Sequence, residues 1–135
     1  MTTKPTVKQL RLVVETDDFD EAVAFYRDVL GMPEEFYLES EGHALVMALQ
    51  AGRATLEIVN PAQKRLIDQL EVGRDVGRSI RVAFEVADAA TFTARALNGG
   101  AQLIAPPTET PWRSLNSRLE APAGLQITLF EELDG

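Results

Sequence analysis

One polar signature occurs twice in this sequence. Each copy has an arginine, a glutamate and an aspartate in the same order and spacing. The pairs are Arg11 and Arg81 (81 − 11 = 70), Glu15 and Glu85 (85 − 15 = 70), and Asp18 and Asp88 (88 − 18 = 70). An internal repeat of this length predicts two copies of one structural unit, and this constrains the possible folds more than any other feature of the chain.

Each copy is predicted to fold as a strand, a helix and three further strands. In the first copy, residues 7–15 have the pattern of a strand, Asp18 can cap the helix that follows, and Gly31 can end it. In the second copy, the strand is 80–86, and the helix runs from Asp88 to Gly99-Gly100. The remaining strands are predicted at 35–38, 44–49 and 54–59, and at 101–104, 117–120 and 125–130, with breaks at Pro106-Pro107 and 121–124.

The chain has 135 residues, of which 45% are apolar, and this suits one domain with its own core. We therefore predict a single α+β domain, residues 1–135, with two β-α-β-β-β modules at about 7–59 and 80–131. Residues 60–79 form the connecting segment. Asn60-Pro61 opens a short helix there that carries Leu66, Ile67 and Leu70, and 73–77 is the linker.

Composition excludes several classes of function. The absence of cysteine rules out disulfides, thiolate metal sites and cysteine nucleophiles, and the single histidine, His43, rules out a multi-histidine metal site within one chain. A net charge of −8 without a basic run disfavours nucleic acid and anionic membranes as partners. No apolar run approaches the roughly 20 residues that span a bilayer, and the N-terminus lacks the features of a signal peptide. A cytoplasmic protein is therefore expected.

Three stretches carry a resemblance to a known family. DFDEAVAFYRDVLG at 18–31 contains a Phe-Tyr pair and ends in Leu-Gly, FEVAD at 84–88 begins the second module, and Pro111-Trp112 precedes the C-terminal strands. Together they resemble the vicinal oxygen chelate superfamily, which includes glyoxalase I, bleomycin-resistance proteins and extradiol dioxygenases. The resemblance covers nearly the whole chain and implies curved mixed sheets that enclose a cavity between the modules. It also implies a homodimer, in which the cavity is completed either within one chain or by modules of two chains.

The resemblance also identifies four positions where metal-dependent relatives hold a divalent ion. Arg11 and Arg81 stand where histidine is usual, Glu57 occupies the position in the last strand of module one, and Thr128 stands where glutamate is common. A guanidinium group has no lone pair to donate, and it repels a cation. One carboxylate and one hydroxyl are too few ligands for a tight divalent site. We therefore predict that the cavity binds no metal and no other cofactor.

The first functional hypothesis is a metal-free binding protein. It would hold a small, anionic or partly apolar molecule, because guanidinium groups bind carboxylates and phosphates in bidentate fashion and an indole ring can stack on a flat ligand. The predicted ligand-binding residues are Gln9, Arg11, Glu57, Arg81, Trp112 and Thr128. Two alternatives stay open: Glu57 neutralises one arginine while the other reaches solvent, and Trp112 only covers an open end of the sheet.

The second hypothesis is an enzyme, namely a lyase, isomerase or dioxygenase of the glyoxalase type. Glu57 would be its general base, and the arginines would stabilise a developing enolate or carboxylate oxyanion. A third possibility is a scaffold whose cavity is filled by side chains. An open cavity would argue against that third possibility.

The metal-free prediction can be tested directly on untagged protein purified without chelator. Mass spectrometry of metal content is expected to find far less than one divalent ion per chain, before and after incubation with zinc, nickel or manganese. A content of about one ion per chain would contradict the prediction, since a tight site retains its metal through purification. It would direct attention to His43, Glu57 and the acidic clusters as ligands.

Overall fold

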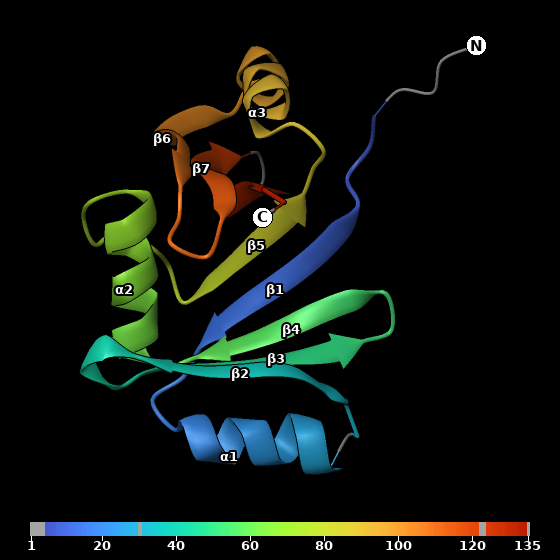
Figure 1. Ribbon diagram of the computed structural model, residues 1–135, viewed down its shortest axis with the longest axis vertical. Helices are drawn as coiled ribbons and strands as arrows, with labels where there is room; N and C mark the ends of the chain where they lie inside the picture. Colours follow the sequence, from blue (N-terminus) through green and yellow to red (C-terminus); the bar gives the residue numbers. More distant parts are fainter. Residues whose placement is uncertain (1–4, 30, 122–123, 135) are drawn as a thin grey trace.

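The computed structural model describes residues 5–29, 31–121 and 124–134. In chain order the elements are β1 (Gln9–Glu15), α1 (Phe19–Val23), η1 (Ala24–Val29), β2 (Glu34–Ser40), η2 (Glu41–His43), β3 (Ala44–Ala51), β4 (Ala54–Val59), α2 (Pro61–Glu71), β5 (Ile80–Glu85), α3 (Ala89–Asn98), β6 (Gln102–Glu109), β7 (Ser114–Ala121) and β8 (Leu125–Glu132). Their strands form one curved, open mixed sheet with the order β2-β3-β4-β1-β5-β8-β7-β6 (Figure 1). The α+β class is confirmed.

The two modules meet where β1 and β5 pair in antiparallel fashion. Each of these strands also has a parallel partner in its own module, β4 for β1 and β8 for β5. Gln9 pairs with Glu85 at one end of the seam. At the other end, the amide of Glu15 donates to the carbonyl of Ser79 at 2.8 Å. The repeat offset of 70 relates the two ends of the seam: Ser79 is the counterpart of Gln9 (9 + 70 = 79), and Glu15 is the counterpart of Glu85 (85 − 70 = 15). The two copies of the sequence repeat are therefore related by a local two-fold axis at the centre of the sheet.

The helices α1 and α3 cover the outer face of one half of the sheet each (Figure 1). Both begin as predicted, because the Asp18 side chain accepts a hydrogen bond from the amide of Glu21 and the Asp88 side chain accepts one from Thr91. The buried cluster of module one is Val23, Met47, Leu49 and Ile58, with Tyr26 packed against it. That of module two is Val82, Val86, Ala89, Phe92, Leu119, Ile127 and Leu129. Each module therefore has its own apolar core, between its helix and the outer face of the sheet.

The first helix is less regular than the sequence predicts. It is α-helical only over Phe19–Val23 and continues in wider π-helical turns over Ala24–Val29. Within those turns the rings of Phe25 and Tyr26 meet edge to face, with centroids 5.1 Å apart. Gly31 follows with φ +76°, the left-handed conformation expected of it, while Leu30 lies outside the described residues.

The prediction that Pro106 and Pro107 end a strand is wrong. β6 runs through both prolines, from Gln102 to Glu109, and its pairing with β7 shifts register on either side of Ala105. β6 is an edge strand, and an edge strand tolerates residues that have no N–H to donate. The next strand, β7, accordingly begins three residues before the predicted 117, and β8 extends to Glu132. Of the predicted turn at 121–124, residues 122 and 123 lie outside the described part of the chain.

The connecting segment forms the predicted helix, α2, and the helix bridges the two modules. The side chain of Asn60 caps it by accepting from the amide of Gln63 at 2.9 Å, and Pro61 is its first residue. The helix contacts β3 and β4 of module one and β6 and β7 of module two (Figure 1). No helix within the described ranges has the length and hydrophobicity needed to cross a membrane.

Candidate ligand-binding cavity

A cavity of about 820 Å³ lies between the two halves of the sheet and α2. Arg11, Glu57, Arg81 and Thr128 all line it, and so does Trp112. The four positions that the sequence predicts to share one face of the sheet therefore line the same cavity. An open space of this size argues against a scaffold whose cavity is filled by side chains, and it lies within the range of small-molecule sites.

The walls of the cavity differ between the modules. In module one, Val13, Val46 and Val59 form a buried apolar cluster on the cavity side, with Phe36 packed against it. In module two, the corresponding face carries polar side chains: Arg81, Ser114, Asn116 and Thr128 line the cavity there. The helix α2 adds Leu66, Ile67 and Leu70 as a third, apolar wall. A ligand in this cavity therefore meets apolar patches on module one and on α2, and it meets charged groups from both modules, including Arg11 and Glu57 as well as Arg81.

Arg11 is engaged within the protein. Its Nη1 donates to Glu57 Oε2 at 3.1 Å, and its Nε donates to Gln9 Oε1 at 2.9 Å. The guanidinium carbon lies 4.9 Å from the centroid of the Phe130 ring. Glu57 therefore neutralises one arginine, as in the first half of the predicted alternative. The second half is wrong, because Arg81 does not reach solvent but is largely buried and donates to Thr128. Gln9, predicted to touch the ligand, does not line the cavity and instead orients Arg11.

Arg81 is in a different situation. Its Nη1 donates to Thr128 Oγ1 at 2.8 Å, and among the described residues no carboxylate forms an ion pair with it. Burial lowers the pKa of the Arg81 guanidinium from its ordinary value, and the negative charge of Glu71 partly offsets this shift. A guanidinium nevertheless keeps its proton at neutral pH. Arg81 therefore presents a charged group to the cavity with N–H donors left over.

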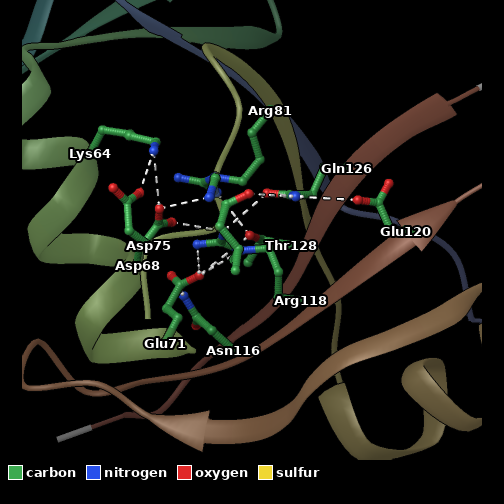
Figure 2. Close-up of polar contacts among 12 residues, drawn as sticks. Lys64, Asp68, Glu71, Asp75, Arg81, Asn116, Arg118, Glu120, Gln126 and Thr128 are labelled. Atoms are coloured by element: carbon green, nitrogen blue, oxygen red, sulfur yellow. Dashed lines mark hydrogen bonds and ion pairs between the residues drawn. The ribbon is translucent and has the colours of Figure 1, made fainter. Parts of the chain in front are cut away.

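A buried charge cluster, which the sequence did not reveal, attaches α2 to module two (Figure 2). Arg118 on β7 is fully buried, and its guanidinium donates to Asp68 Oδ1 at 2.9 Å and to Glu71 Oε1 at 2.7 Å. Asn116 donates to the other oxygen of Glu71 at 2.7 Å, and Gln126 Oε1 accepts from Arg118 at 3.1 Å. The two acids are three residues apart on α2, so they share one helix face.

The linker after α2 is held by the same cluster. Asp68 Oδ2 accepts from the amide of Gly77 at 2.7 Å and lies 3.4 Å from the ammonium nitrogen of Lys64. Lys64 also contacts Asp75 in the linker at 2.6 Å. A Cβ atom on residue 77 would lie 2.6 Å from Asp68 Oδ1, so a side chain there would clash with the carboxylate. Gly77 is therefore required for the close approach of the linker to α2.

Two other residues singled out in the sequence lie near the surface. Trp112, in the loop between β6 and β7, lines the cavity and is 48% exposed, which suits both a ring that stacks on a ligand and a ring that covers an open end of the sheet. His43 is exposed, and its Nδ1 lies 3.3 Å from Glu39 Oε2, a partner that the sequence did not suggest. His43 is not among the residues that line the cavity.

The residues at the four positions do not fit a divalent cation. Arg11 and Arg81 offer no lone pair, Glu57 Oε2 accepts from Arg11, and Thr128 Oγ1 accepts from Arg81. Across the described residues no group of three or more histidine, cysteine, aspartate or glutamate side chains is placed to hold a metal ion. The chemistry of this donor set favours an anion, and the metal-free state stays a prediction.

Comparison with known proteins identifies the family. The family model for the Glyoxalase/Bleomycin resistance protein/Dioxygenase superfamily matches residues 8–129, and the chain belongs to this superfamily. Among similar solved structures, methylmalonyl-CoA epimerase from Mycobacterium tuberculosis has a TM-score of 0.70 and 18% identity, over 99% of this chain and 94% of that one. A glyoxalase/bleomycin resistance protein/dioxygenase superfamily member from Vibrio splendidus 12B01 has a TM-score of 0.64 and 13% identity, over 94% and 100%.

A protein from Bacillus halodurans C-125 is similar to the same degree, with a TM-score of 0.70, 12% identity and coverage of 98% of both chains. Comparison with curated proteins gives no match. Identities this low establish the shared fold. The ligand and any reaction must therefore be argued from the residues of this chain.

The charge cluster predicts a large stability difference between two arginine variants. Replacing Arg118 with methionine leaves Asp68 and Glu71 buried without their main partner, and it is expected to lower the free energy of unfolding by about 3–5 kcal/mol. Arg78→Met is the matched control, because Arg78 pairs with Glu120 at 2.7 Å on the surface, where a pair contributes about 0–1 kcal/mol. Urea denaturation of both variants measures the difference, and equal losses would contradict the role given to Arg118.

Proposed function

We propose that this protein binds a small anionic, partly apolar molecule in the cavity between its modules, without a metal ion. The observation that carries the proposal is Arg81, a charged side chain that lines the cavity and has no carboxylate in ion-pair contact among the described residues. The planar fork of a guanidinium matches the oxygens of a carboxylate or phosphate. Because Arg81 also has little access to water, an anionic ligand would supply the partner that solvent supplies at the surface.

The position of the apolar walls supports a ligand with two distinct ends. An anionic group at Arg81 would lie on the polar face of module two, beside Thr128. The apolar body would then contact the valine cluster of module one and the apolar side chains of α2. Burial of apolar surface contributes about 25 cal/mol per Å², so this contact supplies affinity, whereas Arg81 supplies selectivity for charge.

The acidic residues at the cavity surface would favour a cationic ligand instead. Glu15, Glu35, Glu41 and Glu132 belong to the cavity lining, and the chain has a net charge of −8. Exposed charges are screened by salt within about 10 Å, whereas a charge inside a cavity is screened much less. Arg81 is therefore expected to set the preference of the inner cavity, and a cationic probe tests the opposite preference.

The test uses three probes of similar size that differ in charge: phenylacetate, 2-phenylethanol and phenethylamine. Phenylacetate is expected to bind tightest, and Arg81→Met should weaken its binding about 10- to 100-fold, since a hydrogen bond to a charged group contributes about 1.5–3 kcal/mol. Arg65→Met is the control, because Arg65 is an exposed residue of α2 outside the cavity lining. Isothermal titration calorimetry at low salt measures the affinities. Equal binding of the three probes, or unchanged binding by Arg81→Met, would refute the proposal.

An enzymatic function with Glu57 as general base is the second candidate. Glu57 lines the cavity, and its charge acts on Arg81, which could stabilise a developing oxyanion. Three of the similar structures are methylmalonyl-CoA epimerases, one of them in complex with methylmalonyl-CoA. Glu57 Oε2 already accepts a hydrogen bond from Arg11 Nη1 at 3.1 Å, so the carboxylate is engaged within the protein rather than free to take a substrate proton. Binding without turnover is for this reason the primary proposal.

Glu57→Gln separates the two candidates. If the protein only binds, this variant should hold phenylacetate severalfold tighter, because Arg11 loses its closer carboxylate partner and keeps only the exposed Glu132 at 3.6 Å. If the protein is an enzyme, wild-type protein should exchange the α-proton of a substrate such as methylmalonyl-CoA with deuterium from solvent, and the variant should not. Calorimetry and proton NMR provide the two measurements, and exchange that persists at full rate in Glu57→Gln would exclude Glu57 as the base.

A further inference from the structure

The side-chain carbonyl of Gln63 is a buried acceptor without a partner. Gln63 lies in the first turn of α2, is 7% exposed and belongs to the cavity lining. Its backbone amide donates to the Asn60 cap, but its Oε1 accepts no hydrogen bond from any described residue. Buried polar atoms in proteins nearly always have a hydrogen-bond partner. A molecule in the cavity is the natural source of the missing donor.

Gln63 lies on the face of α2 that borders the cavity. Gln63, Ile67 and Leu70 are spaced as i, i+4 and i+7, which places them on one face of the helix, and all three line the cavity. The other polar residues buried on this helix, Asp68 and Glu71, already have Arg118 as a partner. Among the buried polar side chains of this helix, Gln63 is therefore the one whose carbonyl oxygen has no partner within the described residues.

Gln63 and Arg81 offer complementary chemistry from different parts of the fold. Arg81, on β5, has only donors, whereas Gln63, on α2, leaves an acceptor unused. We infer that the ligand of this cavity is a hydroxylated organic acid, whose carboxylate contacts Arg81 and whose hydroxyl group donates to Gln63 Oε1. This inference rests on the proposed function, because Arg81 anchors the same ligand. A hydroxyl group suits either orientation of the amide, since it both donates and accepts.

The experiment compares phenylacetate with acids that differ from it by one hydroxyl group: mandelate and the 2-, 3- and 4-hydroxyphenylacetates. In wild-type protein at least one of them is expected to bind about tenfold tighter than phenylacetate, as one added hydrogen bond allows. Gln63→Met keeps the length of the side chain and removes the amide, so the tenfold gain should disappear. Gln69→Met, on the exposed side of the same helix, should retain the gain.

Two further measurements separate a ligand contact from a structural role. The melting temperature of Gln63→Met without ligand should equal or exceed that of the wild type, because the variant removes a buried acceptor that has no partner. A structural role would instead lower it. Gln63→Asn, which keeps the amide but retracts it by one methylene group, should also lose the gain. This second variant provides the result if Gln63→Met does not fold.

The outcomes distinguish this inference from the proposed function. If phenylacetate binds through Arg81 but no hydroxyl group adds affinity, or if the gain survives in Gln63→Met, the role of Gln63 is overturned and the anion site stands. If neither phenylacetate nor any hydroxylated acid binds to the wild-type protein, the proposed function fails and the inference fails with it.

Discussion

The ion pairs of Arg118 with Asp68 and Glu71 hold the third wall of the cavity in place. The helix α2 does not bury its apolar residues in either core, because Leu66, Ile67 and Leu70 line the cavity instead. The helix is attached to module two by charge, through side chains that are 3% exposed or less. A buried ion pair adds little net stability, but its rupture leaves uncompensated charges in the interior. The arrangement therefore fixes the position of α2 without filling the space that a ligand needs.

The cavity is asymmetric although the sheet around it has a local two-fold axis. The strand neighbour of Glu57 is Ala48 in module one, whereas the neighbour of Thr128, its counterpart in module two, is Arg118. Val46 lies opposite Val59, and the corresponding pair in module two is Asn116 and Phe130. The repeat thus preserves the backbone and the first-strand arginines, while the side chains on the inner strands have diverged. Both modules supply charges to the site, but the buried valine cluster belongs to module one and the buried ion pairs of Arg118 belong to module two.

The fold and four cavity positions could be predicted from the sequence, but the contacts that complete the site could not. A repeat and a two-residue strand period determine which side chains share a face, and this was enough to bring Arg11 and Arg81 together. Arg118 and Asp68 lie 50 residues apart, and each suits a solvated position when taken alone, so their contact depends on the docking of α2. The unused acceptor of Gln63 likewise appears only when every neighbour is known. The prediction that a strand ends at Pro106 is wrong because the strand order, which the local sequence does not reveal, makes β6 an edge strand.

The two free edges of the sheet differ in chemistry but have the same effect on self-association. Pro106 and Pro107 interrupt the row of N–H donors along β6, and three carboxylates, Glu34, Glu35 and Glu39, lie along β2. An incoming strand would lack hydrogen-bond donors at one edge and meet clustered negative charge at the other. Growth of the sheet by addition of strands from other copies is therefore disfavoured at both ends. Any contact between copies of this chain should therefore involve the helices or the faces of the sheet rather than its edges.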